Sequence, residues 1–376
     1  MHFDFHGKGA VGMNGKVLNY YAGGNTARGF YSLYESNLEG MDRLFILKGG
    51  PGTGKSSLMK HIGAEWNRKG YDVQYLHCSS DNNSIDGVII EQLKVAIVDG
   101  TAPHVIEPKC PGAVEEYVNL GAAWDSAQLA DQKDKIIQYT ERISAAFQQA
   151  YDCFAQALHI HDDWEKIYIK NMDFSKANAL TEQLLHQLFR NQTLDKKADV
   201  RHRFLGAATP KGAVDFVPNL TEDVAKRYFI KGRPGSGKST MLKKIAACAE
   251  QNGFDVEVYH CGFDPNSLDM VIVRELGFAI FDSTAPHEYF PERESDEIID
   301  MYETIVTPGT DEKYAEQLAD VSGQYASKMK EAISYLAGVK SLRDELEAIY
   351  IEAMNFEMVD KIRDDIQHQI EQLAEK

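Results

Sequence analysis

Two glycine-rich octapeptides, each ending in lysine and serine, carry the clearest chemical signal in the chain. The first is GGPGTGKS at residues 49–56, and the second is GRPGSGKS at residues 232–239, 183 positions later. Both match the pattern G-x-x-x-x-G-K-[ST], in which glycines let backbone N–H groups surround phosphate oxygens. An apolar run precedes each octapeptide and a helix-like stretch follows it, at residues 44–47 and 57–66, and at 228–230 and 240–249. This strand–loop–helix context predicts two nucleotide-binding loops.

The residue types within each loop predict distinct roles. Lys55 and Lys238 are expected to reach the β- and γ-phosphates, and Ser56 and Ser239 to ligate Mg²⁺. The N-terminus of the following helix would add partial positive charge. We therefore predict ATP and Mg²⁺ as cofactors, although one copy could be a decayed loop that binds nothing. The predicted phosphate-binding residues are Gly49, Gly52, Thr53, Gly54, Lys55, Ser56 and Ser57, and Gly232, Gly235, Ser236, Gly237, Lys238, Ser239 and Thr240.

Carboxylates that follow strand-like runs are the candidate metal ligands and catalytic groups. Asp99 and Asp282 each end an apolar run, where a carboxylate can hold the Mg²⁺ shell directly or through water. A capping role in a strand-to-loop turn is the structural alternative. Asp81 and Asp264 follow the second strand of each half and could act as a base or orient water, or simply form an Asx turn. All four are predicted catalytic residues.

Other polar residues near these carboxylates have more ordinary explanations. Asp86 and Asp269 are interpreted as helix caps. Thr101 and His104, with their counterparts Thr284 and His287, could sense the γ-phosphate or be structural.

Two further pairs of residues are candidates for binding a ligand. Arg28 and Lys211 lie at matching positions of an opening loop and could contact phosphate across a domain boundary, although basic side chains in surface loops are usually just solvated. The pairs at 77–78 and 260–261, His-Cys in both, form a poor zinc site because neighbours on a strand point to opposite faces.

The chain is an internal repeat longer than the loops themselves. DVQYLHC at 72–78 realigns with DVEVYHC at 255–261, and AIVDGTAPH at 96–104 with AIFDSTAPH at 279–287. Strands alternate with helices in each copy, which predicts a parallel sheet with helices on its faces. The predicted fold class is α/β, with two duplicated P-loop NTPase domains at 1–198 and 199–376, each carrying an added long helical segment.

Those helical segments show an amphipathic rhythm. Ile136, Ile143, Phe147 and Phe154 belong to the apolar face of the first, and Leu318 to that of the second. The simplest interpretation is a helical hairpin packed on its own domain. The alternative is an arm that binds an unidentified protein partner or forms a homo-oligomer.

Bulk composition narrows the class of protein. The chain has 376 residues, 57 acidic against 40 basic, and a formal net charge of −17. Such a charge argues against nucleic acid as a partner, apart from a local basic groove. No run of 18 apolar residues suggests a membrane span, five cysteines form no disulfide framework, and the N-terminus does not read as a secretory signal. We expect a cytoplasmic location.

The chain resembles a family of tandem P-loop ATPases of unknown physiological role, found mainly in Firmicutes-type bacteria. The resemblance covers nearly the whole chain and rests on AGGNT at 22–26 with GF at 29–30, LKGGPGTGKS at 47–56, HCSSD at 77–81, DGV at 86–88 and VDGTAPH at 98–104. It implies nucleotide binding and the P-loop fold, without a substrate. The second half departs from the pattern, with Ala207-Ala208 in place of Gly24-Asn25 and Arg233 in place of Gly50, so the two sites are expected to differ.

The predicted function is a Mg-dependent ATP-binding protein that is a slow ATPase and couples nucleotide state to the geometry of its domains or of a partner. Gly100 and Ser283 stand where many motor ATPases carry a glutamate that polarises water. A small-molecule P-loop kinase is the alternative, although the arginines that could build a lid are few: Arg142 and Arg190 in the first half, and Arg293, Arg343 and Arg363 in the second. A non-hydrolysing regulatory scaffold is a third. The absence of an N-K-x-D tetrapeptide favours ATP over GTP.

Overall fold

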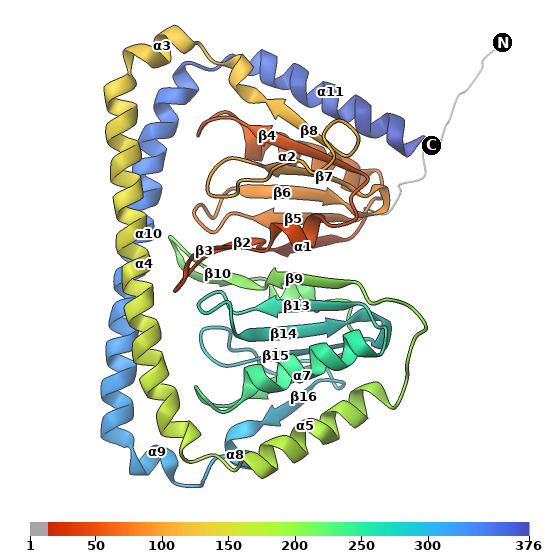
Figure 1. Ribbon diagram of the computed structural model, residues 1–376, viewed down its shortest axis with the longest axis vertical. Helices are drawn as coiled ribbons and strands as arrows, with labels where there is room; N and C mark the ends of the chain where they lie inside the picture. The colour runs from red at the N-terminus through yellow and green to blue at the C-terminus, as the bar shows by residue number, and fades with distance from the viewer. Residues whose placement is uncertain (1–13, 376) are drawn as a thin grey trace, which may run out of the picture.

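The computed structural model describes residues 14–375, which form two similar α/β domains with a pair of long helices along one side (Figure 1). The strands of the first domain are β1 (Val17–Tyr20), β4 (Arg43–Lys48), β5 (Val73–His77), β6 (Ile85–Ile90), β7 (Val95–Asp99) and β8 (Glu115–Asn119), with the hairpin β2 (Gly23–Thr26) and β3 (Gly29–Ser32). Its helices are α1 (Tyr34–Leu38) and α2 (Lys55–Arg68).

The second domain repeats these elements. Its strands are β9 (Val200–Phe204), β12 (Lys226–Lys231), β13 (Val256–His260), β14 (Leu268–Val273), β15 (Phe278–Asp282) and β16 (Glu297–Asp300), with the hairpin β10 (Gly206–Thr209) and β11 (Gly212–Asp215). Its helices are α6 (Val217–Leu220) and α7 (Lys238–Gln251). The remaining helices are α3 (Ser126–Asp131), α4 (Lys133–Ile169), α5 (Phe174–Phe189), α8 (Met301–Ile305), α9 (Thr310–Lys313), α10 (Ala315–Glu352) and α11 (Phe356–Ala374).

Each sheet has six strands in equivalent order, β1-β5-β6-β7-β4-β8 and β9-β13-β14-β15-β12-β16. The sheets are mixed, because β6 runs antiparallel to β5 and β7, and β14 runs antiparallel to β13 and β15. The prediction of a parallel sheet is therefore correct for the other strand pairs and wrong for β6 and β14. Only a short polar loop separates β5 from β6, and so short a connection can only turn the chain back on itself.

The strand β6 also corrects the interpretation of Asp86. Asp86 and Asp269 lie inside the buried strands β6 and β14, so neither is a helix cap. The alternation of apolar and polar residues is absent there, since every residue of both strands is buried. Continuous burial on both faces hides the period that marks a strand in a sequence.

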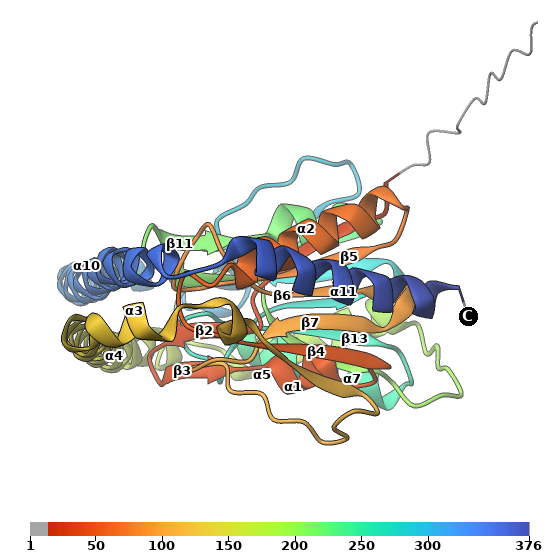
Figure 2. The same ribbon diagram turned by 90° about the horizontal axis from the view of Figure 1, so that it is seen from above.

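The two long helices exchange partners between the domains. We call α4 the first arm and α10 the second arm. The first arm leaves the first domain, runs along the second arm and leads into α5, which packs on the second sheet (Figures 1 and 2). The second arm runs back along the first arm and leads into α11, which packs on the first sheet. With 37 and 38 residues, each arm is about 55 Å long, enough to pass from one domain to the other. The interpretation of each helical segment as a hairpin packed on its own domain is therefore wrong, and an arm that binds a protein partner or forms a homo-oligomer stays a prediction.

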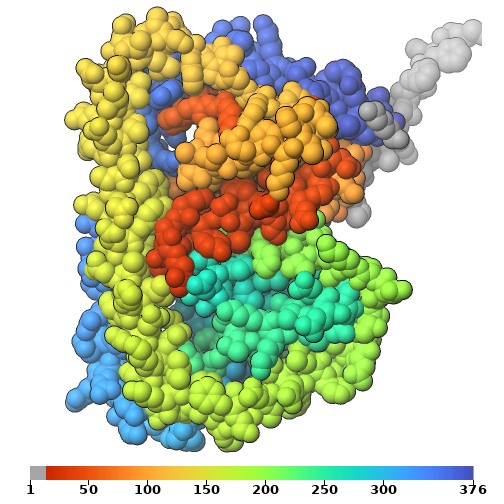
Figure 3. Space-filling view, in the orientation of Figure 1, coloured from red at the N-terminus to blue at the C-terminus, as the bar shows by residue number. Residues whose placement is uncertain are grey.

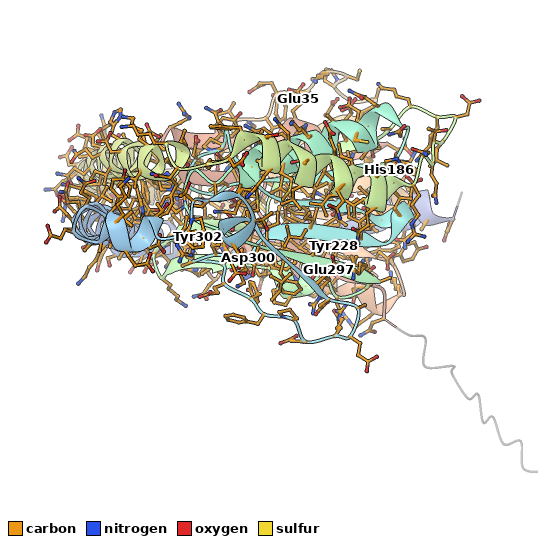
Figure 4. All side chains as sticks on the ribbon, turned by 90° about the horizontal axis from the view of Figure 1, so that it is seen from below. Glu35, His186, Tyr228, Glu297, Asp300 and Tyr302 are labelled. Atoms are coloured by element: carbon orange, nitrogen blue, oxygen red, sulfur yellow. The ribbon has the colours of Figure 1, made fainter. Side chains whose placement is uncertain are left out.

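The hydrophobic core of each domain contains residues from both halves of the sequence. In the first domain, Phe45 and Ile62 share a buried cluster with Ile366 and Ile370 of α11. In the second domain, residues of the strands and of α7 share a buried cluster with Leu184 and Leu188 of α5. The underside of the second domain shows α5, with His186, beside β12, β16 and α8, which carry Tyr228, Glu297, Asp300 and Tyr302 (Figure 4). Each sheet is therefore completed by a helix from the other half of the sequence.

The domains also meet directly. Tyr21 and Phe204 exchange backbone hydrogen bonds of 3.1 and 2.9 Å. Arg203, buried, donates to Glu257 in its own domain and to Gln74 and Asn37 of the first domain at 3.1 and 3.0 Å. A buried cation whose three nitrogens each donate to an acceptor fixes orientation more than it adds stability. Within residues 14–375, no helix is long and apolar enough to cross a bilayer.

Candidate functional site

The first glycine-rich loop, residues 49–54, joins β4 to the start of α2. Gly52 and Gly54 have φ of 70° and 86°, which is backbone that only glycine adopts readily. Lys55 Nζ donates to the carbonyl oxygens of Gly49 and Gly50 at 2.9 and 2.8 Å. The lysine head is therefore held over the loop, at the position where the sequence predicted a phosphate.

The second loop, residues 232–237, repeats this arrangement between β12 and α7. Gly235 and Gly237 have φ of 74° and 85°. Lys238 Nζ donates to the carbonyl of Arg233 at 3.0 Å. Arg233, which replaces Gly50, turns away from its loop and pairs with Asp311 at 2.9 Å. The replacement does not add a free cation at the second loop.

A carboxylate stands beside each lysine. Asp99 pairs in register with Leu47 at the end of β4, so β7 delivers its side chain to the loop. Its Oδ2 lies 3.6 Å from Lys55 Nζ, and Asp282 lies 3.5 Å from Lys238. Thr101 donates to Asp99 Oδ1 from its amide at 2.8 Å and from its hydroxyl at 2.6 Å. Thr101 thus fixes the rotamer of Asp99.

The serine hydroxyls are placed to complete this set of oxygens. Ser56 Oγ accepts from the Ile85 amide at 3.0 Å, and Ser239 Oγ from the Leu268 amide at 2.9 Å. A hydroxyl and a carboxylate are the hard oxygen donors that Mg²⁺ prefers, and two protein ligands suffice when phosphate and water supply the rest. Ser56 with Asp99, and Ser239 with Asp282, fit that donor set.

Asp86 and Asp269 are buried carboxyls that the sequence did not assign to the site. Burial raises the pKa of Asp86, with the nearby His104 acting in the opposite direction. Burial likewise raises the pKa of Asp269 to about 6, opposed by His287. Among the described residues, Asp86 Oδ2 makes no contact with hydrogen-bond geometry, although His104 Nε2 lies 3.3 Å away. A buried carboxyl that lines a cavity and has a raised pKa is a candidate general base.

The histidines behind these carboxyls are held differently in the two halves. His104 Nε2 lies 3.3 Å from Asp86 Oδ2, and the ring packs on Phe30 and Tyr34. His287 Nδ1 instead lies 2.7 Å from Asp215. Burial alone would lower the pKa of His287, but the Asp215 partner raises it. His104 therefore faces the site, whereas His287 is turned to a neighbouring carboxylate.

Asp81 and Asp264 occupy the loops after β5 and β13, but both are engaged. Asp81 accepts from the Asn83 amide at 3.0 Å and from the Ser84 hydroxyl at 2.7 Å, the geometry of an Asx turn. Asp264 accepts from Arg28 Nε at 2.9 Å. Arg28 thus crosses the domain boundary, as the sequence allowed, but it meets a carboxylate there.

Each glycine-rich loop is covered by the arm that comes from the other half. A Cβ on Gly52 would lie 2.8 Å from the backbone oxygen of Glu347 on the second arm, and one on Gly50 would lie 2.8 Å from the Tyr350 ring. At the second loop, a Cβ on Gly235 would lie 2.7 Å from the backbone oxygen of Glu165 on the first arm. The glycines are needed for this close contact between loop and arm.

A cavity of about 600 Å³ lies between the first loop and the arms. The surface is hollowed between the arms and the first domain (Figure 3). All seven phosphate-binding residues predicted in the first loop line the cavity, together with Asp81, Asp86, Asp99 and His104. The structure thus brings together the predicted residues of the first site.

The cavity also contains residues that sequence reasoning did not assign to this site. Lys340, Arg343 and Glu347 of the second arm line it, opposite the loop. The sequence shows that these residues are spaced by three and four positions, which places them on one face of a helix. No nearby residue indicates that this face contacts a loop nearly 300 residues earlier in the chain. Only the exchange of arms makes the connection.

His77 shows why no zinc is expected at the His-Cys pair. Its Nε2 lies 2.8 Å from the Asn19 amide oxygen, and burial lowers its pKa to about 4. Burial raises the pKa of the adjacent Cys78 thiol. The Nε2 atom of His77 is already engaged by Asn19, so it is not free for a metal in this arrangement.

Comparisons with protein-family models, with curated proteins and with solved structures found no match.

Proposed function

We propose that the protein binds ATP with Mg²⁺ and hydrolyses it slowly, coupling nucleotide state to the geometry of its arms. The observation that carries this proposal is the cavity of the first site. There a loop that exposes backbone amides, a lysine, a helix N-terminus and a strand-end carboxylate converge within one space. That combination of groups suits a polyphosphate with a divalent cation.

Phosphate binding, metal binding and proton transfer are assigned to different residues of the first site. Lys55 and the backbone amides of the loop hold the β- and γ-phosphates, and Ser56 with Asp99 would hold Mg²⁺. The metal neutralises charge on the phosphate oxygens when it is bound. A water oxygen forms a bond to the γ-phosphorus, the bond to the β–γ bridging oxygen breaks, and one water proton passes to Asp86. ADP and inorganic phosphate are the products.

Slow turnover is expected from the residue after Asp99. No acidic side chain occupies position 100, where many motor ATPases carry a glutamate that polarises water. We expect basal rates near or below about 1 per second, the low end for enzymes. A partner or a change in the arms would have to raise that rate.

The loops are tested by binding. Lys55→Ala combined with Lys238→Ala should abolish Mg-ATP binding in calorimetry, because charge-assisted contacts to phosphate cannot come from a methyl group. Asp99→Asn combined with Asp282→Asn should lower phosphate release more than binding. Unchanged affinity in the lysine double variant contradicts the proposal.

The competing functions give different outcomes in the same assays. Phosphate released in equal amount to ADP, without an added acceptor, supports hydrolysis. ADP formed only when a small-molecule acceptor is present supports a kinase. Tight binding without any turnover supports a regulatory scaffold.

A further inference from the structure

Arg343 stands out among the residues of the second arm that face the first loop. It lines the cavity of the first site together with Lys55, Asp86 and Asp99. Its charge also reaches the site: burial lowers the pKa of Lys55, and Arg343 lowers it further, while Asp99 opposes both. Arg343 thus acts on the same groups that the proposed function assigns to phosphate and water.

The guanidinium of Arg343 is not neutralised by a close partner. Among the described residues, no carboxylate oxygen lies within 4.0 Å of it and it donates no side-chain hydrogen bond; its guanidinium carbon lies 5.8 Å from the centre of the Phe147 ring. The neighbouring cation Lys340 is different, because it pairs with Asp344 and lies 3.9 Å from Asp81. A cation facing a cavity without a partner is available to an anion there.

The position of Arg343 is fixed by the contact between arm and loop. One turn further along the second arm, the Glu347 carbonyl meets Gly52, and the Tyr350 ring meets Gly50. These contacts place Arg343 opposite the start of α2, where the loop lysine also lies. A change in how the arm sits on the loop would therefore move the arginine relative to the phosphates.

The second site carries a different residue at this position. Glu165 meets Gly235 as Glu347 meets Gly52, so the residue equivalent to Arg343 is His161. Burial lowers the pKa of His161, and Lys238 lowers it further, while Asp162 and Asp264 act in the opposite direction. The rings of Trp164, Phe263 and Tyr325 pack around it at 6.2, 6.1 and 5.6 Å.

A cation that the first domain contributes near the second site is already paired. Arg28 comes from the first domain, but its guanidinium donates to Asp264 at 2.9 Å. The second site therefore has an imidazole among aromatic rings where the first has an arginine that no carboxylate of the described residues within 4.0 Å pairs with. The two sites differ most in the groups that the opposite half contributes.

We propose that Arg343 is a catalytic residue of the first site, supplied across the domain boundary to the γ-phosphate, and that the second site binds nucleotide without comparable turnover. This inference rests on the proposed ATPase function. Charge builds on the γ-phosphoryl oxygens during transfer, and a guanidinium stabilises it with two parallel donors. Hydrolysis at the first site would then depend on the arm whose other end lies at the second domain.

The central test compares turnover with binding. Arg343→Ala should lower single-turnover phosphate release by about 10³-fold or more, the range known for arginines of this kind. Affinity for ADP should change by less than about tenfold, because a contact made mainly in the transition state contributes little to ground-state binding. Arg343→Lys should restore only part of the rate, since an ammonium lacks the planar fork.

Two further measurements separate a catalytic role from a structural one. Added guanidinium ion at low millimolar concentration should partly rescue Arg343→Ala but not Lys55→Ala. Binding of ADP with aluminium fluoride, which mimics the transferring phosphoryl group, should weaken in Arg343→Ala far more than binding of ADP alone. Arg363→Ala, a surface arginine on α11 that pairs with Asp360 and Asp364, is the matched control and should behave as the unaltered protein.

Failure of this inference differs from failure of the proposed function. If the unaltered protein hydrolyses ATP and Arg343→Ala does so at the same rate, the arginine assignment is overturned and the ATPase remains. Equal loss of ADP binding and turnover in Arg343→Ala also overturns it. If the unaltered protein neither binds nor hydrolyses ATP, the proposed function falls and the arginine assignment falls with it.

Discussion

Buried ionisable side chains are the residues on which this site depends most. Lys55, Asp86 and Asp99 lie within one cavity, and burial shifts the pKa of the first two toward their neutral forms. Structural ion pairs also perturb a pKa, and His104 Nε2 lies 3.3 Å from Asp86 Oδ2 without hydrogen-bond geometry, but Asp86 lines the same cavity as the glycine-rich loop. Its place in the cavity makes chemistry the better explanation.

Asp86→Asn should separate chemistry from binding. The amide keeps the shape of the carboxyl but cannot accept a proton, so phosphate release should fall by about 10²–10⁴-fold, the usual share of a general base. Nucleotide affinity should stay within about threefold. Asp131→Asn, an exposed change on α3, is the control. A rate unaffected by Asp86→Asn would remove Asp86 from the mechanism.

Asp269 gives a prediction about pH. Its pKa rises from 3.8 to about 6 on folding, so the folded state holds the proton more tightly than the unfolded chain. The stabilisation is complete below pH 3.8 and is lost as pH rises through 6. Asp269→Asn has no carboxyl to titrate, so it does not lose this stabilisation. The free energy of unfolding of Asp269→Asn minus that of the unaltered protein should increase by up to about 3 kcal/mol between pH 4 and pH 8.

Chemical unfolding of both proteins at several pH values measures this difference. Subtracting one from the other removes the titration of all groups that they share. A difference that does not change with pH, or that changes in the opposite direction, contradicts the raised pKa.

At the scale of elements, the contact between a glycine-rich loop and an arm couples the two halves. The loop presents residues with positive φ, and the arm places a backbone carbonyl directly against them. No side chain fits between. The same contact recurs at Gly235 and Glu165, so it belongs to the fold rather than to one site.

Gly52→Ala should weaken this contact. The new methyl group would lie 2.8 Å from the Glu347 oxygen at a φ of 70°, which should destabilise the protein by about 1–3 kcal/mol. Amides in the last two turns of the second arm should exchange hydrogen faster. Gly338→Ala on the same arm has open space around its Cβ and should stabilise the helix by about 1 kcal/mol. Equal effects of the two changes would show that the loop contact is unimportant.

At the scale of the whole molecule, the exchange of arms makes the two halves interdependent. α11 belongs to the second half of the sequence but lies in the core of the first domain, and α5 does the reverse. The arms pack on each other through Ala150, Phe154 and Leu336. Neither half can bury its own sheet without the other.

This predicts how the chain behaves when it is cut. Residues 191–197, between α5 and β9, are exposed, so a protease site inserted there should be cleaved without unfolding the protein. The two fragments should then elute together as one species, because α5 and α11 each remain in the core of the opposite fragment. Separation of the fragments without denaturant contradicts the exchanged arrangement.

The sequence by itself determined the local features. The glycine-rich loops, the strands before them, the helices after them and the strand-end Asp99 and Asp282 lie where their patterns placed them, because each is specified by neighbouring residues. The domain bounds 1–198 and 199–376 stay a prediction, because α5 and α11 each pack on the sheet of the opposite half. The sequence did not predict the strand β6, because both of its faces are buried and the alternation that marks a strand is absent. For the same reason it did not predict that Asp86 lies at the site.

Only the tertiary structure decided which residues face which loop. The amphipathic rhythm shows that α4 and α10 have an apolar face, but apolar burial is not directional and does not name a partner. Packing over about 55 Å of helix sends each arm to the opposite domain. That is why Arg343, which the sequence assigned to the second half, lies over the glycine-rich loop of the first.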